Sequence, residues 1–116
     1  MMTFEMLRQS IKGLPLKCVR NDYEDFLECV IHEKDLTRLN AMLESFYGPP
    51  VKTANQKSSP ENDRLCALHG GIRENQVLYV KKIETILSLA MLWPWCDCPL
   101  ITVKLYHKPE DMLDSD

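Results

Sequence analysis

The sequence predicts an α+β fold, a two-layer sandwich of two or three helices packed on an antiparallel sheet of about five strands. Three observations support this prediction. Apolar residues recur at helical spacing in the first half of the chain, and they alternate with a period of two in the second half. Short polar turns separate the predicted strands, and short connections favour antiparallel pairing.

The first predicted elements are a short helix and two strands. Thr3 is a suitable N-cap, and apolar residues at helical spacing follow it until Gly13 ends the helix. Strands are expected over residues 16–20 and 26–32, joined by a polar turn at 21–25. Apolar residues occupy both faces of the second strand, which predicts a central position in the sheet.

The clearest predicted element is a helix over residues 36–47, with Asp35 as its N-cap and Gly48 followed by two prolines at its end. This helix should lie across one face of the sheet, because its apolar side chains share one side. We expect it to be buried along Leu36, Leu39, Leu43 and Phe46.

The middle of the chain holds a predicted loop and a further helix. Residues 51–58 are polar and lack large aromatic side chains, which is typical of a mobile loop. Ser59, followed by a proline and an acid, is a helix start, and Gly70 with the next glycine is a stop. A helix of about ten residues with Leu65 and Leu68 facing inward is therefore expected between them.

Three strands are predicted in the last part of the chain, at 77–80, 87–93 and 101–106. Leu, Ala and Met favour helices, so residues 84–93 form either a strand or a helix. We prefer the strand, because a tight connection at 95–99 leads directly into the best-alternating segment and makes a hairpin the simplest arrangement.

The length and composition predict one globular domain over residues 1–109. An acidic tail follows at 110–116. The chain has 116 residues, of which 45% are hydrophobic, and a formal net charge of −3. Nucleic-acid binding usually requires clustered Lys and Arg on a basic domain. We therefore expect no nucleic-acid partner.

Three further features of the sequence predict the cellular compartment of the protein. The first residues lack the basic segment and apolar run of a secretory signal. The longest apolar run, residues 86–95, has about half the length that a membrane-spanning helix needs. Five cysteines without a disulfide-framework spacing leave at least one free thiol in a monomer, which fits a reducing compartment. The expectation is a cytoplasmic protein without membrane contact.

Four residues form a candidate zinc site. Cys66 and His69 are three residues apart on the predicted helix, and Cys96 and Cys98 form a Cys-x-Cys pair at the hairpin turn. Three thiolates and one imidazole suit a tetrahedral zinc ion, although the spacing is not one of the usual zinc patterns. The alternative is that Cys66 is a core residue and that His69 is a cation at a helix C-terminus.

Cys96 and Cys98 also suggest a redox pair, although Asp97 between them disfavours the thiolate form. A hydrolytic Cys-His pair is available by chance, since the chain has three histidines, but no nucleophile signature accompanies it. A Cys-dependent redox or hydrolytic enzyme is therefore the third hypothesis.

Aromatic residues support the preferred hypothesis. Two tryptophans flank Pro94 beside the predicted turn, where they either cover the end of the core or form a contact patch. We prefer an intracellular domain without catalytic activity or cofactor, which binds itself or a protein partner. The predicted contact residues are Met91, Trp93, Trp95 and Tyr106.

Overall fold

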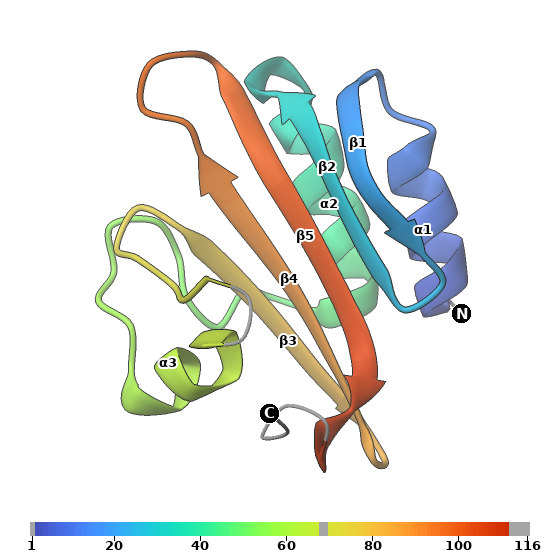
Figure 1. Cartoon of the computed structure of the whole chain (residues 1–116), viewed down its shortest axis with the longest axis vertical. Helices are drawn as coiled ribbons and strands as arrows, with labels where there is room; N and C mark the ends of the chain where they lie inside the picture. The colour runs from blue at the N-terminus through green and yellow to red at the C-terminus, as the bar shows by residue number, and fades with distance from the viewer. Residues whose placement is uncertain (1, 68–69, 112–116) are drawn as a thin grey trace.

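A computed structural model describes residues 2–67 and 70–111 and confirms the predicted α+β fold (Figure 1). Five strands form one antiparallel sheet with three helices packed on it. The helices are α1 (Phe4–Lys12), α2 (Leu36–Tyr47) and α3 (Pro60–Cys66), and a 3-10 turn at Glu33–Asp35 precedes α2. The strands are β1 (Leu16–Tyr23), β2 (Phe26–His32), β3 (Val77–Ile83), β4 (Ile86–Pro94) and β5 (Leu100–Pro109), in the spatial order β1-β2-β5-β4-β3.

Local capping starts two of the three helices as predicted. The Thr3 hydroxyl accepts a hydrogen bond from the Met6 amide at 3.1 Å, and the Ser59 hydroxyl accepts one from the Asn62 amide at 3.1 Å. Asp35 stands at the N-cap position of α2 but makes no capping hydrogen bond with its side chain. The 3-10 turn leads into α2 instead, and α3 is shorter than expected, with seven residues.

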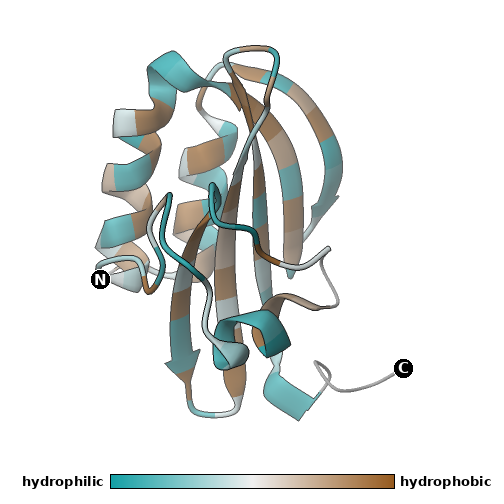
Figure 2. Cartoon of the chain, turned by 90° about the vertical axis from the view of Figure 1, so that its left-hand side faces the viewer, coloured by the Kyte–Doolittle hydropathy of each residue, from teal (hydrophilic) through white to brown (hydrophobic). Residues whose placement is uncertain are grey.

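The main core lies between the sheet and the layer formed by α1 and α2 (Figure 2). The predicted helix over 36–47 is confirmed, and its Leu39, Leu43 and Phe46 side chains are buried. Leu36, in the first turn of the helix, is only partly buried. The buried residues of this cluster include Phe4, Leu7, Ile11, Leu27, Cys29, Ile31, Ala90, Leu92, Ile101, Val103 and Leu105.

Strand β1 extends further than the sequence suggested, because α1 neutralises its polar end. The Asp22 carboxylate accepts a hydrogen bond from Arg8 at 2.9 Å and lies 2.6 Å from the Lys12 ammonium. The hydrogen bond from Lys12 lowers the pKa of Asp22. The predicted polar turn at 21–25 is therefore reduced to the two residues that follow Tyr23.

Residues 86–94 form a strand, which confirms the strand interpretation over the helical one. Alternate side chains of β4 enter different clusters. Ala90 and Leu92 face α1 and α2, whereas Leu89 and Met91 face the opposite side of the sheet. Because both faces of β4 are buried, its residues do not alternate between apolar and polar along the sequence.

Helix α3 packs on the face of the sheet opposite α1 and α2 (Figure 1). Its Leu65 and Cys66 side chains belong to a second apolar cluster on that face. The sheet residues of this cluster are Leu78, Leu87, Leu89, Met91 and Tyr106. Strands β3 and β4 therefore supply most of the sheet residues in the cluster of α3, and β5 supplies one, Tyr106. Leu68, which was expected to face inward, lies outside the described residues.

The predicted mobile loop at 51–58 starts with an anchored lysine. Lys52 bridges to Leu78 of β3, whose amide donates to the Lys52 carbonyl oxygen at 3.0 Å. The Lys52 side chain is fully buried, and its Nζ donates to the carbonyl oxygens of Glu74 at 2.9 Å and of Gln76 at 2.6 Å. Burial lowers the pKa of Lys52. The segment is thus fixed to the sheet at its beginning.

The segment that follows β5 is held at its start by β3 and by the turn between β3 and β4. Within the predicted acidic tail at 110–116, the Glu110 amide donates to the Thr85 carbonyl oxygen at 2.8 Å, and its carboxylate pairs with Lys82 at 2.9 Å. Residues 112–116 lie outside the described residues. In the described part of the chain, none of the helices has the length and apolar character to cross a membrane.

Candidate functional site

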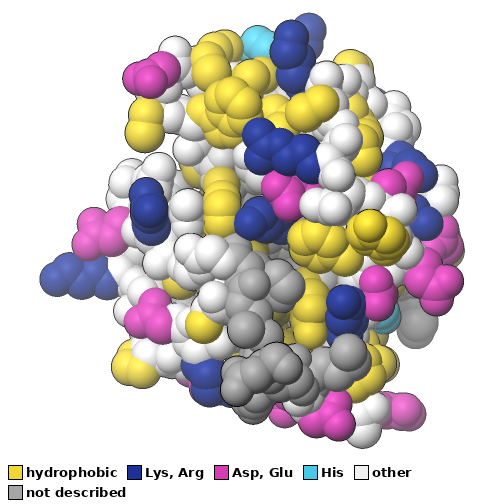
Figure 3. All heavy atoms as spheres, in the orientation of Figure 1, with side chains coloured by type: hydrophobic (Ala, Val, Ile, Leu, Met, Phe, Trp, Pro, Cys, Tyr) yellow, Lys and Arg dark blue, Asp and Glu magenta, His cyan; other side chains and the backbone are white. Residues whose placement is uncertain are grey.

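Helix α3 covers only part of the sheet face on which it packs. Over β1, β2 and much of β5, α3 does not cover this face. Figure 3 views this face and shows two groups of hydrophobic side chains with Lys, Arg, Asp and Glu side chains between them. We call this surface the open face. It is formed by Arg20, Tyr23, Phe26, Glu28, Trp95, Lys104 and Lys108.

Strand register places these side chains on one side of the sheet. Phe26 pairs with Tyr106 and Glu28 pairs with Lys104 across β2 and β5, while Tyr23 of β1 pairs with Phe26. Paired residues of antiparallel strands point to the same side. Since Phe26 and Tyr106 belong to the second apolar cluster, the open face continues the surface that α3 covers.

Trp95 is held at one end of the open face with its ring partly exposed. Its side chain has 39% of its surface accessible, and its indole N–H donates to the Thr102 hydroxyl at 2.9 Å. The Arg20 guanidinium lies 5.8 Å from the ring centroid. Arg20 also donates to the Glu28 carboxylate at 3.3 Å. The ring is therefore oriented before any partner binds.

Trp93 is half-buried beside Trp95 and packs differently. The Lys104 Nζ lies 3.6 Å from the centroid of its ring, which is a close cation–π contact. Burial lowers the pKa of Lys104, and the Glu28 carboxylate opposes that shift. The Trp93 ring covers the end of the second cluster, which is the alternative that the sequence left open for the tryptophans.

Two of the predicted contact residues lie in the core. Met91 and Tyr106 have only 2% and 5% of their surfaces accessible, because they pack in the second apolar cluster. These two side chains are therefore buried next to the open face and are not part of it. The period-two pattern places all four predicted residues on one side of the sheet, but it does not indicate which of them a helix covers.

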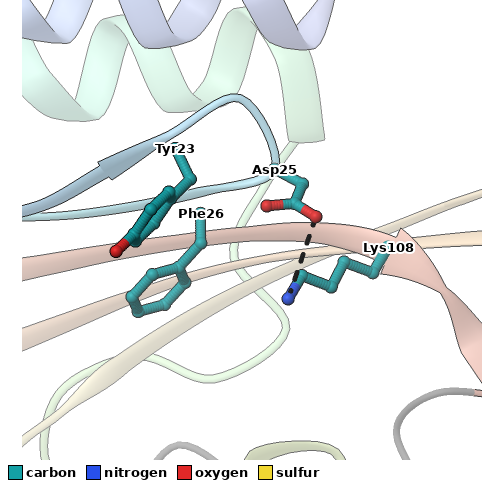
Figure 4. Close-up of a pocket in the computed structure, with 4 residues that line it drawn as sticks. All are labelled: Tyr23, Asp25, Phe26 and Lys108. Carbon is teal, nitrogen blue, oxygen red and sulfur yellow. Dashed lines mark ion pairs between the residues drawn. The ribbon is translucent and has the colours of Figure 1, made fainter.

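A pocket of about 480 Å³ lies at the other end of the open face, where β1 turns into β2 (Figure 4). Tyr23 and Phe26 form one wall, while Asp25 and Lys108 point toward each other with their charged atoms 3.8 Å apart. Tyr23 is the most exposed aromatic side chain of this wall, at 62%. The sequence does not reveal this pocket, because Lys108 reaches it only through the pairing of β2 with β5.

The two outer strands of the sheet are poorly suited to adding another strand. The register of β1 shifts twice, between Leu16 and Cys18 and between Val19 and Asn21. Such bulges disrupt the row of hydrogen-bonding groups along an edge. The other outer strand, β3, already bridges to Lys52 at Leu78. The structure thus favours contact through the face of the sheet over contact through its edges.

The candidate zinc ligands are only partly brought together. Cys96 and Cys98 are exposed and line one hollow of about 560 Å³ at the hairpin tip, whereas Cys66 is buried in the second cluster. His69 lies outside the described residues. Among the described residues, no three His, Cys, Asp or Glu side chains are grouped closely enough to hold a metal ion. The four-ligand site remains a prediction.

The position of Trp93 depends on Gly70. A Cβ at residue 70 would lie 2.5 Å from the Trp93 ring, and the backbone φ of +94° is one that L side chains rarely adopt. We expect Gly70→Ala to lower the free energy of unfolding by about 1–3 kcal/mol from backbone strain, with a further loss from the displaced ring. Urea denaturation followed by tryptophan fluorescence measures both effects.

Gly71→Ala is the matched control. Gly71 also has a positive φ, +78°, but a Cβ there would meet no atom within 4 Å. This variant should show the backbone strain alone, with the native fluorescence of Trp93 unchanged. If both variants changed the native spectrum equally, the contact between residue 70 and Trp93 would be contradicted.

The open face therefore combines two exposed aromatic residues, an arginine held beside Trp95 and the carboxylate of Glu28, with Asp25 at its border. The hairpin tip with its two thiols adjoins this surface through Trp95. Comparisons with protein-family models, with curated proteins and with solved structures find no match for this chain.

Proposed function

We propose that this protein is a protein-interaction domain without catalytic activity, and that it associates with a second copy of itself through the open face. The observation that supports this proposal best is the uncovered half of the sheet, where Trp95 and Tyr23 stay exposed although α3 buries the other half. Exposed aromatic residues grouped on one face are characteristic of protein contact surfaces.

The residue types support a protein partner. Tyr, Trp and Arg are the residues that most often dominate the binding energy of protein interfaces. On the open face, Trp95 and Arg20 are in contact at one end and Tyr23 lies at the other. On the open face, Arg20 is paired with Glu28 and Lys108 with the adjacent Asp25, which reduces the positive charge that this surface offers to a phosphate backbone. A nucleic acid would meet this surface less favourably than a protein would.

The charge pattern favours a second copy as the partner. A two-fold contact uses the same patch on both chains, so the patch must complement itself. The open face carries cations and anions side by side, with Arg20 next to Glu28 at one end and Lys108 next to Asp25 at the other. Because each end carries both signs, a two-fold axis through this face allows basic groups of one chain to lie opposite acidic groups of the other.

Self-association can be tested with Trp95→Ala. If the open face is the interface, truncating this ring should weaken dimerisation by about 2 kcal/mol or more, which raises the dimer dissociation constant about 30-fold. Sedimentation velocity over a dilution series measures that constant. The loss is expected because the ring is oriented by Thr102 and Arg20 before association.

Ile83→Ala is the matched control, since Ile83 is a hydrophobic side chain with the same exposed fraction as Trp95, 39%, at the opposite end of the sheet. Its dissociation constant should match that of the wild-type protein. A protein that stays monomeric over the whole concentration range would overturn self-association. Equal weakening by both variants would contradict the placement of the interface on the open face.

A further inference from the structure

The five cysteines fall into two chemical groups. Cys29 and Cys66 are buried, and burial raises the pKa of each thiol to about 12. Such thiols carry almost no thiolate at neutral pH and are unreactive. Cys18, Cys96 and Cys98 are exposed to solvent. Only these three are accessible to a dissolved reagent.

Cys96 and Cys98 share a short loop that β4 and β5 close. The Trp95 amide donates to the Leu100 carbonyl oxygen at 2.9 Å, so that only residues 96–99 lie between the two closing positions. Two α-carbons separated by one residue lie at most about 7 Å apart in a fully extended chain. A disulfide needs about 4.4–6.8 Å, so a chain that reverses direction here brings the pair within range.

Both thiols also line the same hollow of about 560 Å³, together with Arg73 and Gln76. The Arg73 guanidinium can attract an anionic reagent, whereas the Asp97 carboxylate opposes it. A hollow of this size admits a small disulfide. The geometry therefore offers one entry site from which a reagent can reach either sulfur.

We propose that Cys96 and Cys98 form a redox-active dithiol that exchanges with low-molecular-weight disulfides such as oxidised glutathione. This inference goes beyond protein association and does not depend on it. The thiolate of one cysteine attacks a sulfur of the small disulfide, which forms a mixed disulfide and expels one thiolate. The second cysteine, as thiolate, then attacks the protein sulfur of the mixed disulfide and expels the second small thiolate.

The exchange is balanced in atoms and electrons. The two cysteines lose two electrons in total and form one sulfur–sulfur bond, while the small disulfide gains two electrons and yields two thiols. The two protons that leave the cysteines are taken up by the expelled thiolates. Because the ring that closes is small and strained, its disulfide should be easily reduced again, which suits exchange more than structural bracing.

The test uses the full chain carrying Cys18→Ser, which removes the third exposed thiol. After incubation with oxidised glutathione and acid quenching, intact-mass analysis should show monomers that have lost two hydrogen atoms and retain no glutathione. Adding Cys96→Ser or Cys98→Ser to this background removes the resolving thiol, so each of those variants should retain one glutathione adduct. Cys29 and Cys66 should remain unmodified in all three proteins.

Two outcomes would overturn the proposal. One is retention of glutathione on the Cys18→Ser protein to the same extent as on the double variants, which would mean that the second thiol does not resolve the adduct. The other is a disulfide between two chains as the main product, seen as a dimer on non-reducing gels. Circular dichroism of each variant verifies that the exposed serines leave the fold unchanged.

Discussion

Replacing Leu43 with alanine is expected to lower the free energy of unfolding by about 2–5 kcal/mol. Leu43 lies in the middle of α2, its side chain is fully buried, and it packs in the cluster between the helices and the sheet. The substitution removes apolar contacts and leaves a cavity that the surrounding core fills only in part. Urea denaturation followed by circular dichroism measures the loss.

Glu44→Ala is the control for Leu43→Ala, because residue 44 is the next position of the same helix and is exposed. Alanine is a good helix former, so this variant should change the stability by no more than about 0.5 kcal/mol. An unchanged denaturation midpoint for Leu43→Ala would contradict the packing of α2 on the sheet.

Lys52→Met should also destabilise the protein strongly. The methionine keeps most of the length of the side chain but removes the ammonium that donates to the Glu74 and Gln76 carbonyl oxygens. Leaving the buried Gln76 carbonyl oxygen without its donor costs about 1–3 kcal/mol, whereas the Glu74 oxygen keeps the hydrogen bond from the Asn55 amide. The loss should appear as a lower urea midpoint, measured with the same method.

Lys57→Met is the matched control, since Lys57 lies in the same segment but is exposed. Its stability should stay within about 0.5 kcal/mol of the wild-type value. If Lys52→Met were as stable as Lys57→Met, the ammonium would contribute no net stabilisation, and the anchoring of the segment at Lys52 would be contradicted.

The sequence predicted the elements whose formation depends on neighbouring residues. The caps at Thr3 and Ser59 start α1 and α3 as expected, and α2 occupies the predicted range of 36–47. The alternation of residues 101–106 lies within β5. Capping, helical periodicity and strand alternation act over a few residues, so they are visible in the chain itself.

Only some of the residues that form the open face could be predicted from the sequence. Trp95 lies on the exposed surface, whereas Met91 and Tyr106 are buried in the second apolar cluster. The sequence does not indicate which face of the sheet a helix covers, because that choice depends on how a distant segment returns across the strands. The pocket between Tyr23 and Lys108 was missed for the same reason.

The sequence by itself determined the α+β class, the approximate positions of the helices and of β1, β2, β3 and β5, and it favoured the hairpin that carries Cys96 and Cys98. The tertiary structure decided that residues 86–94 form a strand, that α3 packs opposite α1 and α2, that Lys52 is buried, and that α3 leaves one sheet face uncovered over β1 and β2. The physical reason is that local patterns set the backbone of each element, whereas burial depends on which distant elements meet across the sheet.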